Sequence, residues 1–326
     1  MFNTKIKMAT SIAAGLLMAG AAHAQEEFNY GTVSMKGDAG IILMSTQDQF
    51  DEANGLDIKP LPLKGDSLLL KALIAGEIDA YVGNPGGPLI AASKGADIEI
   101  LACPWPGLTY ALYTKPEIEN VAGLKGGSIG VSSPGSLPDL FARGVLRSAG
   151  LSQDDVSIVV AGSGSERVAA VVAGIITAAP SSSEFQARAP DLGLKMLVHA
   201  RDVVPEYVRL CIMANGAAVE ADPEKYERFI AAQIEGFTFA LENREETIAL
   251  SKELANLPEN DKTAAFAIDE AIEFSVVDLE MNVDVGKLRW LRDLLADNDR
   301  LSADFDPADI INTAVLDAAK LRVAAQ

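Results

Sequence analysis

The feature that most constrains the fold of this chain is an internal repeat. Residues 73–101 and 171–198 align without a gap when the first passage is shifted by 98 positions, so that Leu73 falls on Val171. The coincidences are Ala75-Gly76 with Ala173-Gly174, Ile78 with Ile176, Ala80 with Ala178, and Gly95 with Gly193. Because the order of elements around the two passages repeats as well, we expect two similar α/β units.

Each half of the repeat follows one order of elements. A strand that ends in glycine and serine opens the halves at 30–34 and 129–133, and a β-rich run follows at 56–63 and 156–162. An amphipathic helix that stops at a glycine comes next, and a short strand, a helix and a last strand complete the unit. This alternation predicts two parallel-type sheets with helices on their faces.

Helices alone are predicted beyond residue 220. Asp222 and Pro223 are typical of a helix N-terminus, as cap and first residue, and apolar residues then recur at helical spacing. Further helices are expected at about 244–256, 260–279, 284–297 and 307–323. We expect this all-helical C-terminal part to pack around the first unit and to reach the second.

The first 24 residues are typical of a secretory signal peptide. Lys5 and Lys7 precede an apolar run at 12–20, and Ala22-His23-Ala24 is a small-x-small cleavage pattern. The run is too short for a good transmembrane span, and no cysteine stands at the cut for lipid attachment. We therefore expect a soluble mature chain that begins near Gln25, outside the cytoplasm.

Length and charge limit what the mature chain can be. Without its first 24 residues it has 302, which is long for one hydrophobic core and favours two lobes. The formal net charge of −19 becomes −21 when Lys5 and Lys7 are removed. Such acidity argues against nucleic acid and anionic membranes as partners, so an anionic ligand would have to be held by local groups.

No catalytic or metal constellation is present in the sequence. Cys103 and Cys211 permit one disulfide in an oxidising compartment or two buried thiols, and two cysteines alone do not make a structural zinc site. His199 is the one histidine left after His23 is removed, and its apolar neighbours favour a structural role. No HExxH motif or Walker loop is present, so we expect no catalysis, metal or cofactor.

Loops rich in glycine, serine and proline follow the predicted strands in both halves. In open α/β sheets, ligands bind beyond the carboxyl ends of the strands. Two lobes whose loop edges face each other form a cleft, and we expect a ligand there.

In the second half, three loops supply candidate ligand-binding residues. Ser132, Ser133 and Ser136 can donate hydroxyls beside a helix N-terminus, which favours an anion, although capping alone also explains them. Ser163 precedes the next helix, and Arg167 lies in its first turn, where the helix dipole disfavours a cation. Arg167 therefore pairs with Glu166, grips an anion in the cleft, or is a surface arginine. The third loop carries Ser182 and Ser183.

In the first half, the matching positions are Ser34, Met35, Lys36, Asp38 and Asn84. Trp105 lies near the predicted crossing to the second lobe, and Tyr207 near the returning one. Both aromatics are candidates for stacking on a planar ligand, and core packing explains them equally well.

Four passages resemble periplasmic solute-binding proteins of ABC transporters. They are LIAGEIDA, GLKGGSIGVSSPGS, GSGSERVAAVVAG and DPEKYERFIAA, and the resemblance covers nearly the whole mature chain. The branch that it most resembles serves aliphatic sulfonates, taurine, nitrate and thiamine pyrimidine precursors. The resemblance implies a type 2 periplasmic-binding fold with two crossing segments, a ligand between the lobes, no catalysis and no cofactor. Thr177 stands where the second lobe of such proteins often has aspartate, which weakens the expectation for the loop through Ser183.

Together, these patterns predict an α/β protein of the two-lobed type 2 periplasmic-binding fold. We expect 1–24 as signal peptide, 25–112 with 208–326 as the first lobe, and 113–207 as the second, with the ligand cleft between them. The expected function is the periplasmic subunit of an ABC importer. It would be a monomer that captures a small organic anion, a sulfonate or carboxylate, aromatic or not, and delivers it to an inner-membrane permease.

Two alternatives stay open from the sequence. One is a sensor or partner-presenting protein of the same fold that binds a solute but feeds no permease. The other is an enzyme of thiamine pyrimidine synthesis, whose eukaryotic members rely on histidine and a cysteine cluster that this chain lacks.

Overall fold

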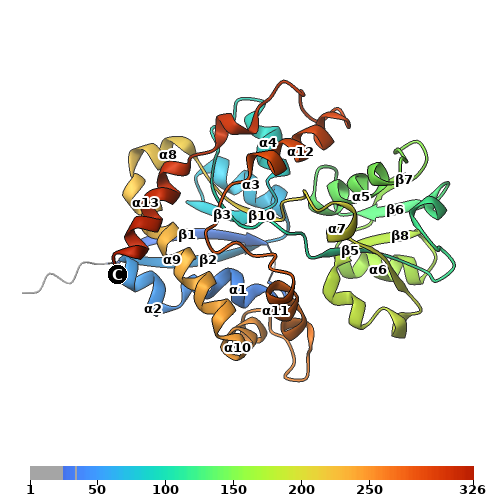
Figure 1. Ribbon diagram of the computed structural model, residues 1–326, viewed down its shortest axis with the longest axis horizontal. Coiled ribbons are helices and arrows are strands. Elements are labelled where there is room, and N and C mark those ends of the chain that lie inside the picture. The colour runs from blue at the N-terminus through green and yellow to red at the C-terminus, as the bar shows by residue number, and fades with distance from the viewer. Residues whose placement is uncertain (1–24, 34) are drawn as a thin grey trace, which may run out of the picture.

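Two five-stranded sheets form the frame of the computed structural model, which describes residues 25–33 and 35–326 (Figure 1). The predicted signal peptide, 1–24, and Ser34 lie outside the described residues. The first sheet has the order β2-β1-β3-β10-β4, with β1 Glu26–Val33, β2 Leu56–Leu63, β3 Ala80–Gly83, β4 Glu99–Trp105 and β10 Leu210–Ala214. The second has the order β7-β6-β8-β5-β9, with β5 Tyr110–Thr114, β6 Ser128–Val131, β7 Ser157–Val160, β8 Ala178–Ser182 and β9 Lys195–His199.

Both sheets are mixed. β1 pairs in parallel with β2 and β3, and β6 with β7 and β8. β10 is antiparallel to β3 and β4, and β5 is antiparallel to β8 and β9. The chain leaves the first sheet through β4 and returns through β10, so the two strands must run in opposite directions. The α/β two-lobed fold is therefore confirmed, with β10 and β5 as the strands antiparallel to the parallel units of their sheets.

Helices cover the sheets and form the C-terminal part. Around the first sheet lie α1 Ala39–Leu43, α2 Asp48–Asp51, α3 Asp66–Ala75, α4 Gly86–Ala92, α8 Gly216–Ala221, α9 Pro223–Glu242, α10 Arg244–Leu254, α11 Thr263–Glu273, α12 Val285–Ala296 and α13 Thr313–Ala324. The second sheet carries α5 Leu137–Ser148, α6 Gly164–Val172 and the short α7 Ala200–Val203, with α5 and α6 on opposite faces (Figure 1). All regular elements after β10 are helical, as predicted.

The internal repeat correctly predicted the residues at which two helices end. Gly76 follows α3 with φ 71°, and Gly174 follows α6 with φ 72°. Only glycine adopts this left-handed conformation without a steric cost, and it ends a helix by letting the chain reverse direction. Both helices are thereby stopped just before the short strands β3 and β8.

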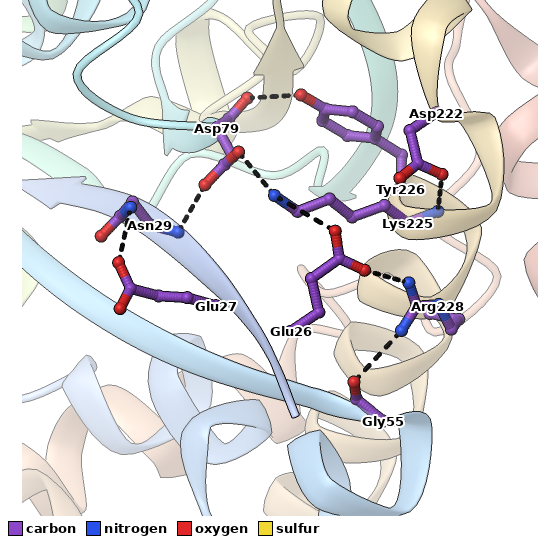
Figure 2. A network of polar contacts seen from close by, with 9 residues as sticks. All are labelled: Glu26, Glu27, Asn29, Gly55, Asp79, Asp222, Lys225, Tyr226 and Arg228. Atoms are coloured by element: carbon purple, nitrogen blue, oxygen red, sulfur yellow. Dashed lines mark hydrogen bonds and ion pairs between the residues drawn. The ribbon is translucent and has the colours of Figure 1, made fainter. Parts of the chain in front are cut away.

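A polar network fixes the amino ends of β1 and β3 to α9 (Figure 2). Lys225 Nζ lies 2.9 Å from Asp79 Oδ1, and Asp79 Oδ2 accepts a 2.6 Å hydrogen bond from the backbone N–H of Asn29. Arg228 donates to Glu26 and, at 3.1 Å, to a backbone carbonyl before β2. The carboxyl ends of β1 and β3 lie at the opposite edge of the sheet. Asp79 therefore stabilises the sheet and lies far from the loops that follow these strands.

Two features stabilise the region of the crossings between the two halves. Cys103 in β4 and Cys211 in β10 form a disulfide, which joins the strands on either side of the two crossings. α12 packs on α4 of the first half and on α5 of the second, and its Leu291 and Leu294 belong to one apolar core with residues of both.

Candidate functional site

A cavity of about 590 Å³ lies where the strand exits of the two sheets face each other. Its walls come from the ends of β1, β3 and β10 on one side, and from the ends of β6 and β8 with the start of α6 on the other. This is the place that the carboxyl-end rule predicts for a ligand in an open α/β sheet. The polar and charged residues of the lining are Thr32, Lys36, Asp38, Lys64, Asp66, Asn84, Tyr110, Ser132, Ser163, Glu166, Arg167, Ser182 and Arg209.

The structure brings many of the predicted site residues to this cavity. Those in its lining are Met35, Lys36, Asn84, Ser132, Ser163, Arg167 and Ser182. Those outside the lining are Trp105, Ser133, Ser136, Ser183 and Tyr207. Ser34 lies outside the described residues.

Arg167 is the most distinctive group in the wall. Its side chain is 3% exposed, and it donates from Nε to Pro180 O at 3.0 Å and from one terminal nitrogen to Gly162 O at 2.6 Å. The other terminal nitrogen donates to Tyr110 Oη at 3.0 Å. All three acceptors are neutral, so the guanidinium is held rigidly and forms no ion pair with any carboxylate that the structure describes, although its charge contributes to lowering the pKa of Glu166. A guanidinium in this state is suited to an anion, since a buried charge is costly without a partner.

Glu166 does not neutralise Arg167, because it serves the helix in which both lie. Ser163 caps α6, and Glu166 Oε2 accepts a 2.6 Å hydrogen bond from the Ser163 backbone N–H. This reciprocal capping box uses the carboxylate to satisfy the helix start. The hydrogen bonds from the Ser163 backbone and side chain hold the pKa of Glu166 below its usual value.

The serine loop before α5 combines turn chemistry with a cavity wall. Ser136 Oγ donates to Ser133 O at 2.6 Å and accepts from Ser132 Oγ at 2.9 Å. Asp139 Oδ2 accepts from the Gly135 N–H at 2.7 Å, which braces the same turn. Ser133 and Ser136 thus shape the loop, and Ser132 is the member of the three that reaches the cavity lining.

The predicted aromatics lie behind the wall. Trp105 and Tyr207 are both fully buried, so core packing describes their place. Asn84 Nδ2 donates to Tyr207 Oη at 3.0 Å, and the Arg209 guanidinium lies 4.1 Å from the centroid of the Trp105 ring. Each aromatic therefore supports a residue of the lining.

Sequence reasoning left Arg209 and Asp66 out of the candidate set, and it named Asp38 as a matching position without giving it a role. Arg209 donates to Asp38 across 171 residues of sequence. Burial opposes ionisation of Asp38, but Arg209 and Lys36 outweigh it and hold the pKa of Asp38 below its usual value. A cation at the returning crossing was one available signal, and the carboxyl-end rule applied to β2 would have pointed to Asp66.

Glu184 is close enough to Asp38 and Arg209 for their charges to affect its ionisation. Burial and the neighbouring Asp38 carboxylate raise the pKa of Glu184 to about 7, against the opposing effect of Lys36 and Arg209. The group is therefore close to half-ionised at neutral pH, which makes it a sensitive reporter of the state of this region.

Comparison with known proteins gave one family match and many structural ones. The model of the family described as NMT1/THI5 like matches residues 38–247. The aliphatic sulphonate binding protein SsuA from Escherichia coli has a TM-score of 0.72 and 21% identity, over 88% of this chain and 92% of that one. The nitrate-binding protein NrtA from Synechocystis PCC 6803 has a TM-score of 0.73 and 15% identity, over 92% and 89%.

A ligand-binding component of an ABC-type import system from Staphylococcus aureus, with zinc bound, is similar at a TM-score of 0.71 and 16% identity, over 90% of this chain and 99% of that one. A search of curated proteins gave no match. At these identities the solved structures establish a shared fold.

Proposed function

This chain belongs to the NMT1/THI5-like family, and on that premise we propose that it is the solute-binding component of an ABC importer that captures a small organic anion. The proposal draws its support from the position of the cavity between two sheets and from the fold shared with sulfonate- and nitrate-binding proteins. The anion is a sulfonate or a carboxylate.

The observation that carries the proposal is the state of Arg167. Its hydrogen bonds to two backbone carbonyls and to Tyr110 fix the guanidinium, and no described carboxylate neutralises it. Hydrogen bonds to a charged group contribute about 1.5–3 kcal/mol each, and a preorganised donor loses little side-chain entropy on binding. An acidic protein can thus hold an anion by local groups alone.

The lobes that would close on the ligand are 25–112 with 208–326, and 113–207. The two sheets support this division, with the first crossing in the short segment between β4 and β5. Closure would bring the β1 and β3 exits against the start of α6, and the ligand would supply the differential affinity that closure requires.

The remaining chemistry of the chain favours binding over catalysis. His199 is buried outside the cavity lining and bonded to Glu270, and both cysteines are joined in a disulfide. That disulfide fits the oxidising periplasm, where we place the protein together with its permease partner. Within residues 25–33 and 35–326, no helix has the length and apolar character of a membrane span.

Calorimetry with the Arg167→Ala variant tests the proposal. We expect one or more small sulfonates or carboxylates to bind the unchanged protein, and the substitution to weaken that binding by about ten- to a hundredfold, the effect of losing a charged hydrogen-bonding partner. Arg188→Ala, at an exposed position of the same half, is the control. Equal affinities in the Arg167→Ala variant and the unchanged protein would refute the anion-binding role. X-ray scattering that never changes with a bound anion would refute closure.

A further inference from the structure

Asp66 presents a second uncompensated charge to the cavity, from the opposite side. It is the first residue of α3, lines the cavity, and accepts a 2.9 Å hydrogen bond at Oδ1 from the Asn84 backbone N–H. It forms no ion pair with any residue that the structure describes. Burial raises the pKa of Asp66, and the attraction of Lys36 does not cancel that effect.

The other charges at the cavity are already in use or exposed. Asp38 and Arg209 neutralise each other, and Glu166 completes the capping box of α6. Lys36 and Lys64 are exposed at the rim. The cavity therefore has a half-buried carboxylate on one wall, Asp66, and a buried guanidinium on the other, Arg167.

We propose that the ligand is dipolar, and that Asp66 selects it by pairing with a cationic group while Arg167 holds the anionic one. This inference rests on the proposed function, because it assigns the other end of the same ligand. The ligand class is a small acid that also carries an ammonium, amidinium or protonated ring nitrogen. A cavity of about 590 Å³ is the size of a small-molecule site.

The physical reason is the cost of enclosing an unpaired carboxylate. When the lobes close and exclude water, a purely anionic ligand would leave Asp66 desolvated and facing a like charge. A cationic group on the ligand turns that cost into a charge-assisted hydrogen bond, which is among the stronger polar contacts in proteins. Specificity would then come from rejection of simple anions as well as from attraction of dipolar ones.

The test uses matched probes and one conservative substitution. The probes are ethane-, propane- and butanesulfonate and the corresponding carboxylates, each compared by calorimetry with its counterpart that carries a terminal amine. We expect the unchanged protein to prefer the amine-bearing member of at least one pair by about tenfold or more. Asp66→Asn keeps the acceptor for the Asn84 N–H and should reduce that preference to within about twofold. Glu77→Gln removes an exposed carboxylate just after the same helix and should leave the preference unchanged.

The outcomes separate this inference from the proposed function. If simple anions bind the unchanged protein as tightly as their amine counterparts, the ligand is not dipolar, although anion capture stands. An amine preference that survives in the Asp66→Asn variant would overturn the role of Asp66 alone. If no probe of either kind binds, anion capture itself fails, and the inference fails with it.

Discussion

His199 and Glu270 bond to each other across the boundary between the two sheets. His199 Nε2, at the end of β9, lies 2.8 Å from Glu270 Oε1 in α11, and Ser183 Oγ donates to the other oxygen of the same carboxylate. All three side chains are buried. α11 otherwise packs into the core of the first sheet through Ala264 and Ile268. A helix of the C-terminal part is thereby fastened to the loop that carries Ser182 of the cavity wall.

Replacing Glu270 by alanine should destabilise the protein. The change leaves the buried Ser183 hydroxyl and the His199 ring without their partner, and an unsatisfied buried polar group costs about 1–3 kcal/mol. We expect the free energy of unfolding, measured by urea denaturation, to fall by about 2–4 kcal/mol. Glu273→Ala, at an exposed position of the same helix, should change it by less than about 0.5 kcal/mol. Equal effects of the two variants would contradict the structural role of the Glu270 contacts.

Glu184 should make stability depend on pH. Its pKa in the folded protein is raised to about 7, so folding favours the protonated form. The corresponding stability is complete below the ordinary carboxyl pKa and is lost as pH rises towards about 7. We expect Glu184→Gln to flatten the pH dependence of the unfolding free energy between these limits, by about 3 kcal/mol. The exposed Glu253→Gln serves as control. A slope that is identical in the unchanged protein and the Glu184→Gln variant would show that this carboxyl does not titrate as described.

Asp66→Asn should stabilise the protein in the absence of ligand. Burial raises the pKa of Asp66, so its ionised form opposes folding at neutral pH, and the amide removes that charge while it keeps an acceptor for the Asn84 N–H. We expect the melting temperature, measured by calorimetry without ligand, to rise by a few degrees. A fall in melting temperature would mean that the carboxylate stabilises the empty cavity.

The disulfide should contribute strongly to stability. Cys103 and Cys211 are 108 residues apart in sequence, and a cross-link over a loop of that length is expected to contribute about 3–4 kcal/mol, mainly by restricting the unfolded chain. Urea denaturation of the Cys103→Ala/Cys211→Ala double variant should show this loss. Addition of a thiol reductant should lower the stability of the unchanged protein and leave that of the double variant as it was. A reductant effect of equal size in both would rule out the bond as its cause.

Local patterns predicted much of the fold and little of the pairing in the cavity. The glycines after α3 and α6 and the cap before α9 depend on neighbours in sequence, and the structure has them as predicted. β5 and β10 were not among the predicted strands. Both are short runs buried on both faces, so they lack the alternation that marks a half-buried strand.

In the candidate site, contacts between residues far apart in sequence were even harder to predict. Arg167 drew attention because a cation in the first turn of a helix is locally unfavourable. Arg209 and Glu270 carry no such local sign, since their partners Asp38 and His199 lie 171 and 71 residues away and meet them only through the folded arrangement of both sheets.

The apolar core beneath α12 also limits how the two halves of the molecule can move apart. α12 lies on one side of the crossing strands and α11 on the other (Figure 1), and the α12 side is sealed by leucines that contact both halves. Separating the two halves on the α12 side would expose the leucines to water, whereas separating them on the α11 side breaks mainly polar contacts, those of Glu270 and the stacking of Arg201 on Phe274. The movement of least cost is thus a swing about the α12 side, and a solute would enter from the side of α11.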